Sequence, residues 1–428
     1  MDRRVFLAGA AALATAGVGL PALAKSEAKA SVVIAGAGAA GLSIASRLAR
    51  QMPNATITIF DARRDHYFQP GWTLVGAGWW SPGETVDSTK GYIPSGVKWI
   101  EQNIIEFDPE GHSVTDASGK KYQYDWLFVT TGLSLNYEQV QGMSQDLIGL
   151  KGIASIYAGP EAAAASARVI DQYIQTGGVA LFGRPATGMK CAGAPLKMTF
   201  ITDDKARRAN RRKACTIRYA AHNGGLFAVK PVNERLKVMF AERDIEPMYN
   251  HVIHAIDADA RKATYQTPDG LVTLDYDMIH LIPPMSAPPA VRNSPLPWQS
   301  GPQAPGGWIE VDPYSLRSPR FPNVFAVGDV AGVPKGKTAA SVKWQVPVAV
   351  DHMIAAANGL SSPKRYNGYT SCPMVTGLGK AMLIEFDYEG NLTPSFPFID
   401  PLKELWVSWF IEEKALRGTY RAMLRGYA

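Results

Sequence analysis

The hydrophobic pattern near the start of the chain predicts a strand that leads directly into a helix. Residues 31–35 form a short run of small and β-branched residues, as expected for a buried strand. After a glycine-rich turn, apolar residues recur at helical spacing from Leu42 to Ala49, and a second β-prone run follows at 56–60. This order of strand, turn, helix and strand is typical of a βαβ unit in a parallel sheet.

The glycines of the turn carry the first chemical signal. Gly36 permits a tight turn, Gly38 lets the backbone approach a pyrophosphate, and Gly41 lets the helix pack close to the strand. Asp61 lies 20 residues after Gly41, where a ribose hydroxyl needs a carboxylate acceptor. A lone glycine motif is weak evidence, but this context predicts a dinucleotide site, without separating FAD from NAD. The predicted contacts of this motif are Gly36, Gly38, Ala39, Ala40, Gly41 and Asp61.

Later segments favour FAD. The aromatic and glycine-rich residues 66–78 suggest a loop around a flat ligand, although a loop packed on the core would have the same composition. The apolar strand within 124–132 ends in a small-residue turn that can close over the dinucleotide, and 324–329 repeats a strand followed by Gly-Asp, whose carboxylate can accept from ribityl hydroxyls. The helix after Lys337 can direct its positive end at the flavin ring. The candidate contacts in these segments are Thr131, Gly132, Gly328, Asp329 and Lys337.

A second nucleotide-type unit is predicted in the middle of the chain, with a broken motif. The strand at 178–182 leads into Gly183-Arg184-Pro185-Ala186-Thr187-Gly188. Pro185 stands where a glycine should approach a pyrophosphate, and its ring and missing N–H oppose that approach. We therefore expect this unit to keep the architecture and to have lost its nicotinamide site.

These elements predict an α/β fold of two Rossmann-like domains with a C-terminal, membrane-attaching helical region. The expected organisation is a signal peptide at 1–24, the first part of an FAD-binding domain at 25–150, a second Rossmann-like domain with a degenerate NAD site at 151–295, the second part of the FAD-binding domain at 296–360, and a C-terminal region with a redox cysteine and the membrane attachment at 361–428.

The composition and charge limit the classes of partner that we expect. The net charge of +6 is modest and no Lys/Arg cluster is interleaved with aromatics, so nucleic acid is not an expected partner. A basic balance suits an anionic membrane surface or a small anionic substrate. Three scattered cysteines are too few for a disulfide framework or a metal site, and no metal is expected.

Two of the three cysteines lie in loop contexts that favour chemistry. Cys191 follows the broken motif, beside Lys190 and before a predicted helix, and both features would lower the pKa of a thiol. Cys372 lies in a polar turn flanked by Pro373 and Gly377. Cys215 opens an ordinary strand and is expected to serve packing, which is the commoner role of a single cysteine.

The two ends of the chain carry further signals. The first residues resemble a twin-arginine export signal, with Arg3-Arg4, an Ala/Gly-rich apolar run and the cleavage site Ala22-Leu23-Ala24; the alternative is an uncleaved anchor helix. Near the other end, large aromatic residues accompany arginines at 417, 421 and 425 at helical spacing, which is typical of a helix lying in a membrane interface. The alternatives for this helix are packing on the protein's own core and a dimer contact.

Taken together, the motifs resemble the sulfide:quinone oxidoreductases, particularly the branch that includes the mitochondrial enzyme. The resemblance covers most of the chain after the signal and rests on the segments 36–41, 66–78, 190–195, 283–286, 325–329, 337–340, 369–373 and 423–427. It implies that Gln69 touches FAD, and the candidate cofactor contacts also include Ile104. It further implies a catalytic redox pair of Cys191 and Cys372. FAD is expected to be non-covalent, because the loop after the second strand lacks the cysteine that links flavin in an exported relative.

The implied activity is FAD-dependent oxidation of sulfide to polysulfide or sulfane sulfur, with electrons passed to a membrane quinone. The expected partners are sulfide, a small sulfur acceptor, the quinone and a monotopic membrane contact through the C-terminal helices, on the periplasmic face of the inner membrane. The identity of the sulfur acceptor, the quinone type, the oligomeric state and the cysteine that faces the flavin stay open, with Cys191 favoured for the last.

Three alternative functions share the expected FAD site. A flavoprotein subunit of a cytochrome-coupled sulfide dehydrogenase fits the export signal. An NADH dehydrogenase of the same fold is disfavoured by Pro185, and an FAD-holding scaffold without turnover is disfavoured by the two cysteines.

Overall fold

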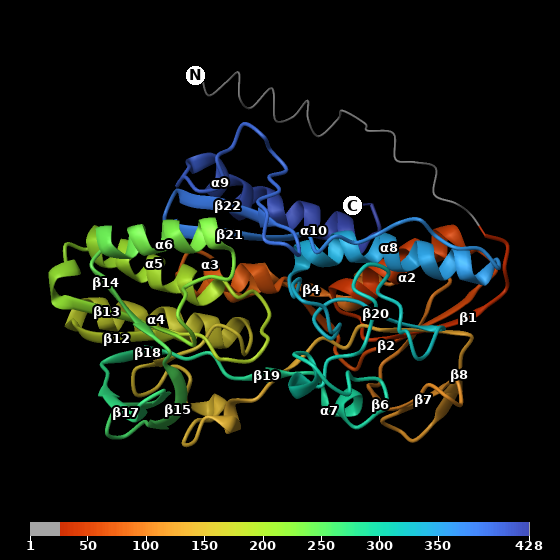
Figure 1. The fold of residues 1–428 in the computed structure, drawn as a ribbon, viewed down its shortest axis with the longest axis horizontal. Helices are drawn as coiled ribbons and strands as arrows, with labels where there is room; N and C mark the ends of the chain where they lie inside the picture. Colours follow the sequence, from red (N-terminus) through yellow and green to blue (C-terminus); the bar gives the residue numbers. More distant parts are fainter. Residues whose placement is uncertain (1–25, 428) are drawn as a thin grey trace.

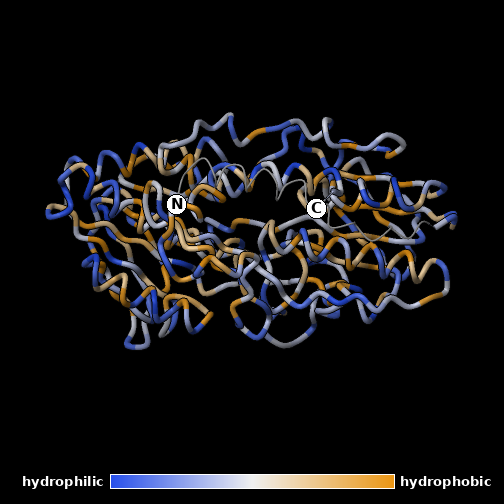
Figure 2. Tube along the Cα trace, turned by 90° about the horizontal axis from the view of Figure 1, so that it is seen from above, coloured by the Kyte–Doolittle hydropathy of each residue, from blue (hydrophilic) through white to orange (hydrophobic). Residues whose placement is uncertain are grey.

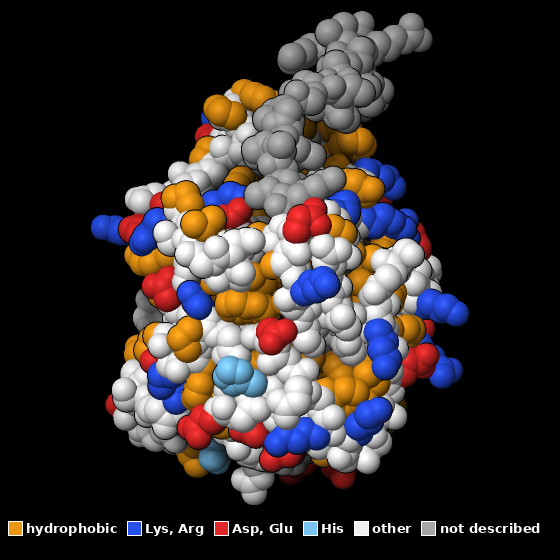
Figure 3. Space-filling model, turned by 90° about the vertical axis from the view of Figure 1, so that its right-hand side faces the viewer, with side chains coloured by type: hydrophobic (Ala, Val, Ile, Leu, Met, Phe, Trp, Pro, Cys, Tyr) orange, Lys and Arg blue, Asp and Glu red, His pale blue; other side chains and the backbone are white. Residues whose placement is uncertain are grey.

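The computed structural model describes residues 26–427, which form two lobes side by side with the C-terminal segment lying across the top (Figure 1). The predicted export signal lies outside the described residues. Hydrophobic segments run through the interior of both lobes and hydrophilic segments surround them (Figure 2). On the face seen in Figure 3, acidic and basic side chains are interspersed rather than gathered by sign.

The first lobe is built on a five-stranded parallel sheet with the strand order β20-β9-β1-β2-β5. Val32, Ile34 and Phe128 are fully buried, since helices and loops cover both faces of the sheet, as continuous apolar runs predict. The helices α2 and α8 pack on each other over this sheet (Figure 1). The elements of this lobe are β1 (Ser31–Ala35), α2 (Ala39–Gln51), β2 (Thr56–Phe60), β3 (Asp65–Tyr67), α3 (Trp72–Gly76), β4 (Val86–Ser88), β5 (Lys98–Ile100), β6 (Ile104–Asp108), β7 (Ser113–Asp116), β8 (Lys121–Gln123), β9 (Trp126–Val129), α7 (Pro289–Arg292), β20 (Val324–Ala326) and α8 (Ala339–Ala357).

The second lobe repeats the plan. Its parallel sheet has the order β11-β18-β12-β13-β14 and carries an antiparallel three-stranded sheet, β15-β16-β17, as an appendage. The short antiparallel pair of β10 (Ser134–Leu135) and β19 (Met285–Ser286) joins the segments that enter and leave this lobe. The elements are β11 (Ile153–Ala154), α4 (Pro160–Thr176), β12 (Gly178–Gly183), α5 (Ala194–Arg208), β13 (Cys215–Ala221), α6 (Lys230–Glu242), β14 (Ile245–Tyr249), β15 (Val252–Asp257), β16 (Lys262–Thr267), β17 (Gly270–Asp275) and β18 (Met278–His280).

This architecture confirms the predicted fold class of two Rossmann-like units. The return of β20 to the first sheet, about 190 residues after β9, agrees with the interrupted first domain. The residue boundaries of the domains stay predictions.

The C-terminal segment bridges the two lobes. A hairpin of β21 (Thr370–Gly377) and β22 (Lys380–Phe386) packs on α5, and it is followed by α9 (Trp406–Phe410), a π-helical turn (Ile411–Ala415) and α10 (Leu416–Leu424). The helix α10 packs on α2, where the Ser46 hydroxyl donates to the Leu424 carbonyl at 2.7 Å. The segment therefore closes over both lobes from above (Figure 1).

The arginines of α10 contact the protein itself. Arg421 forms an ion pair with Asp87 at 2.6 Å, and the Arg425 guanidinium lies 4.7 Å from the centroid of the Tyr92 ring. Packing on the chain thus accounts for this stripe. The exposed apolar groups nearby include Phe398, 73% exposed, and Trp406, 51% exposed. Across residues 26–427, no helix combines the length and hydrophobicity needed to cross a bilayer. Membrane contact by this region stays a prediction.

Candidate functional site

A cavity of about 520 Å³ lies where the two lobes and the C-terminal segment meet. The predicted residues that line it are Gly36, Gly38, Ala39, Ala40, Asp61, Gln69, Thr131, Gly132, Cys191, Gly328, Asp329, Lys337 and Cys372. Two predicted cofactor contacts do not line it: Gly41 lies within α2, and Ile104 is buried in β6. The cavity therefore gathers residues from segments more than 300 positions apart.

The glycines at the start of the cavity divide their roles as the motif predicts. Gly36 has φ of +108°, and a Cβ there would lie 2.6 Å from the Thr130 carbonyl oxygen. A Cβ on Gly38 would meet nothing within 4 Å, so this backbone is open for a ligand to approach. A Cβ on Gly41 would lie 1.8 Å from the Gly36 oxygen, so Gly41 allows close packing and leaves ligand contact to its neighbours.

Polar groups around this turn are arranged to hold a ligand. The Asp61 carboxylate accepts from the Ala37 N–H at 2.9 Å, which places it against the glycine turn. The Thr131 hydroxyl is buried and has no hydrogen-bond partner among the described residues. The N-terminal ends of α2 and α8 both face the cavity through Ala39 and Ala339. Open backbone, helix N-termini and an unpartnered hydroxyl together fit the phosphates and ribose of a dinucleotide.

Two lysines, Lys190 and Lys337, line the cavity near Asp329. Lys190 donates to the Gln69 side chain at 2.7 Å, and burial lowers the pKa of Lys190 to about 8. Lys337 donates to the carbonyls of Asp329 and Ala331 at 2.5 and 3.0 Å, and burial lowers its pKa to about 7. Burial raises the pKa of the Asp329 carboxyl. Cations in this part of the cavity favour an electron-rich or anionic ring system.

The two predicted redox cysteines are brought together. Cys191 and Cys372, 181 residues apart, share a thiol hydrogen bond in the cavity wall. Cys191 has φ of +46°, its N–H donates to the Lys337 carbonyl at 3.0 Å, and the Tyr157 hydroxyl donates to its carbonyl at 2.9 Å. A Cβ on Gly193 would lie 2.3 Å from the Cys372 sulfur, so the glycine gives the second thiol its room.

The surroundings favour a thiolate on Cys191. The hydrogen bond from the Cys372 thiol and the nearby Lys197 ammonium lower the pKa of Cys191 to about 6, against the opposing effect of burial. The same hydrogen bond and burial raise the pKa of Cys372 well above its ordinary value. In the reduced pair, the thiolate is therefore Cys191, and Cys372 keeps its proton.

A buried ion pair beside the cysteines was not identified from the sequence. The Lys197 ammonium lies 3.4 Å from the Glu412 carboxylate, and each side chain is only 3% exposed. Glu412 comes from the π-helical turn, and its second carboxylate oxygen has no partner among the described residues. A lysine within the apolar stretch 194–201 was the available signal, since such a residue needs a partner when buried.

Cys215 lies apart from this site. It opens β13 and is 2% exposed, and burial raises the pKa of its thiol. It is absent from the residues that line the cavity, so its predicted packing role agrees with its position.

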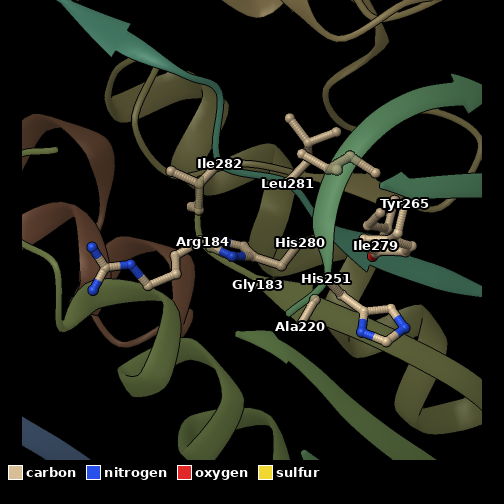
Figure 4. Close-up of a pocket in the computed structure, with 10 residues that line it drawn as sticks. Gly183, Arg184, Ala220, His251, Tyr265, Ile279, His280, Leu281 and Ile282 are labelled. Atoms are coloured by element: carbon tan, nitrogen blue, oxygen red, sulfur yellow. The ribbon is translucent and has the colours of Figure 1, made fainter. Parts of the chain in front are cut away.

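Two residues of the broken motif, Gly183 and Arg184, line a small cavity in the second lobe. Gly183, Ala220 and His280, at the carboxyl ends of β12, β13 and β18, line a space of about 10 Å³. Arg184 and His251 point in opposite directions from it (Figure 4). This volume is close to that of one water molecule. The loss of a nicotinamide site stays a prediction.

The chain is similar to known proteins over most of its length. The family model described as pyridine nucleotide-disulphide oxidoreductase matches residues 30–352. Two curated relatives are the mitochondrial sulfide:quinone oxidoreductases of Dictyostelium discoideum and Mus musculus, 36% and 33% identical over 400 residues, or 92% of this chain and 86% of each relative. The solved structure of the sulfide:quinone oxidoreductase from Aquifex aeolicus has a TM-score of 0.76 at 19% identity, covering 92% of this chain and 91% of that one, and supports the fold.

Proposed function

Because this chain belongs to the family of sulfide:quinone oxidoreductases and is an FAD-dependent oxidoreductase, we propose that it oxidises sulfide at the Cys191–Cys372 pair and passes the electrons to a quinone. The observation that carries the proposal is the meeting of the two thiols in the wall of the cavity that fits the cofactor.

FAD would be held non-covalently. The turn at Gly36 and Gly38 and the N-terminus of α2 would bind the pyrophosphate, Asp61 a ribose, and Asp329 with Lys337 the flavin end. When bound, the flavin accepts two electrons from the sulfur site and releases them to the next acceptor.

The cysteines divide the sulfur chemistry between them. In the oxidised protein, HS⁻ attacks one sulfur of a Cys191–Cys372 bridge, forms a new S–S bond there and releases the other sulfur as a thiolate. Cys191 is the better leaving group because the nearby Lys197 ammonium lowers the pKa of its thiol. HS⁻ therefore attacks Cys372, which becomes the persulfide, and Cys191 becomes the thiolate near Lys197. A second nucleophile then removes the outer sulfur as sulfane sulfur or polysulfide and leaves Cys372 as a thiolate. The two reduced cysteines would return to the bridge by giving two electrons to the flavin.

The sulfur chemistry is tested by anaerobic mixing with sulfide, followed at the flavin absorbance before and after a quinone is added. Cys191→Ser and Cys372→Ser should each abolish bleaching by sulfide, while Cys215→Ser, the matched control, should retain most of the rate. Loss of bleaching only in Cys215→Ser would contradict the assignment. Rapid reoxidation by a c-type cytochrome but not by quinone would favour the cytochrome-coupled alternative.

We also propose that the protein contacts a membrane through the exposed apolar groups of the C-terminal segment. Phe398 and Trp406 lie near the hairpin, and an aromatic group next to polar loops suits the interface of a bilayer. Truncation after Pro401 would remove α10 and expose α2, so point variants are the better test. Phe398→Ser with Trp406→Ser should weaken sedimentation with anionic vesicles, and Leu150→Ser with Leu271→Ser, equally exposed on the second lobe, should not.

Export through the twin-arginine route to the periplasm remains part of the proposal. The curated relatives are named as mitochondrial. Fractionation of cells that express the full chain should recover the protein on the periplasmic side, and Arg3→Lys with Arg4→Lys should retain it in the cytoplasm. Cytoplasmic recovery of the unchanged chain would contradict this.

A further inference from the structure

Successive side chains along β21 and β22 lie on alternate faces of the hairpin. The cysteine site is on one face and a group of polar side chains is on the other. Cys372 pairs with Ile384, and this face packs into the core of the second lobe together with Met374. Ser371 pairs with Glu385, so both side chains lie on the opposite face of the hairpin. Both faces line the large cavity. The sulfur site and the groups around Glu385 therefore lie on opposite faces of the hairpin.

The opposite face presents a hydrogen-bonded network in an aromatic wall. The Tyr369 hydroxyl donates to the Glu385 carboxylate, which also accepts from the Ser395 hydroxyl at 2.6 Å and the Ser395 N–H at 2.7 Å. Tyr369 contacts Trp344, with ring centroids 5.2 Å apart, and Phe396 lines the same part of the cavity. Flat aromatic side chains next to a carboxylate suit a planar ligand that exchanges protons.

The network also connects the cavity with solvent. Glu385 is 3% exposed, Ser395 lies on the surface, and Tyr369 is partly buried. Burial and the hydrogen bond to Glu385 raise the pKa of Tyr369, so its hydroxyl keeps its proton between turnovers. All three residues line the cavity, and the Tyr369 and Ser395 hydroxyls are also 3.2 Å apart, so they form one hydrogen-bonded group that reaches from the cavity to the surface.

Quinone reduction needs such a connection. Conversion of a quinone to its quinol consumes two electrons and two protons, and an anionic reduced flavin supplies both electrons and one proton. One further proton must reach an oxygen of the quinone bound in the cavity. We propose, on the basis of the quinone-reducing function proposed above, that Tyr369 gives its hydroxyl proton to the quinone oxygen while Glu385, protonated from solvent beside Ser395, returns a proton to Tyr369. The net change is one proton moved from solvent to the quinol, with Tyr369 and Glu385 restored.

The test separates the two half-reactions in Tyr369→Phe. Reduction by sulfide should stay within about twofold of the unchanged protein, while reoxidation by a short-chain quinone should slow about 100-fold, as for loss of a general acid. Reoxidation by ferricyanide, which takes electrons without protons, should be unchanged, as should the Kd for quinone measured by quenching of tryptophan fluorescence. Ser395→Ala, which keeps the carboxylate, should slow quinone reduction about tenfold. Tyr122→Phe, whose hydroxyl donates to Asp116 at 2.9 Å away from the cavity, is the matched control and should change neither half-reaction.

Unchanged quinone reoxidation in Tyr369→Phe, or equal slowing with quinone and ferricyanide, would overturn the proton path. Unchanged protein that is bleached by sulfide and not reoxidised by any quinone would instead overturn the proposed function, and the path with it.

Discussion

The ionisation of Cys191 offers a prediction that depends on the tertiary structure alone. The hydrogen bond from Cys372 is the largest cause that lowers the pKa of Cys191 to about 6. Cys372→Ala removes this donor and leaves Cys191 among groups whose burial opposes ionisation. We expect the pKa of Cys191 in the reduced protein to rise to about 8.5, the ordinary value of a thiol, or above it.

The size of the expected change in the pKa of Cys191 decides whether the alkylation rate or its pH profile should be measured. At pH 7 a thiol with a pKa of about 6 is about nine-tenths ionised, whereas one with a pKa of about 8.5 is about 3% ionised, an approximately thirtyfold difference in thiolate. A more basic thiolate is a better nucleophile, and a Brønsted coefficient of about 0.45 over about 2.5 units returns about thirteenfold. The alkylation rate at pH 7 should therefore fall only about twofold, while the midpoint of the pH profile moves by more than two units.

The assay is the pH dependence of iodoacetamide alkylation at Cys191, followed by mass spectrometry of the reduced protein in a Cys215→Ser background. Lys197→Met should move the midpoint upward as well, by less than Cys372→Ala, because Lys197 acts on Cys191 through charge whereas Cys372 donates a hydrogen bond to it. A midpoint that stays near 6 in Cys372→Ala would refute the assignment of the thiolate to Cys191 through its partner.

Further outcomes follow from single contacts. NADH and NADPH should reduce the flavin far more slowly than sulfide because Pro185 blocks the pyrophosphate turn, and rapid bleaching by NADH would revive the dehydrogenase alternative. Gly193→Ala should slow formation of the cysteine bridge by oxidants, since the added Cβ would lie 2.3 Å from the Cys372 sulfur; an unchanged rate of thiol loss would show that the loop adapts. Asp203→Asn should lower the free energy of unfolding by about 3–5 kcal/mol in urea titrations, because the fully buried carboxylate binds three arginines, and a loss below about 1 kcal/mol would contradict this. Burial lowers the pKa of His280 to about 3, so between about pH 6.5 and that value the unfolded state binds a proton that the folded state excludes, and stability should fall by about 1.4 kcal/mol per unit as the pH drops; His280→Leu should flatten that slope, and an unaltered slope would assign it to other groups.

Local pattern was sufficient for the first Rossmann-like unit. This unit consists of the strand 31–35, the glycine turn, a helix and the strand that ends at Asp61. Its elements contact close neighbours in the sequence, so the hydrophobic pattern and the glycine positions are enough to predict it. The strand predicted at 178–182, before the broken motif, is likewise present as β12. Ile104, one of the predicted cofactor contacts, is buried in β6 and does not line the cavity.

Only the tertiary structure decided which distant groups meet. Lys197 and Glu412, and Tyr369 and Glu385 across the hairpin, are paired by the packing of the C-terminal segment and by strand register, neither of which a local period records. The arginines of the C-terminal helical region are a second example of what local spacing cannot predict. Their helical spacing was correct, but the spacing of a helix does not say which surface covers each face, and here Asp87 and α2 do.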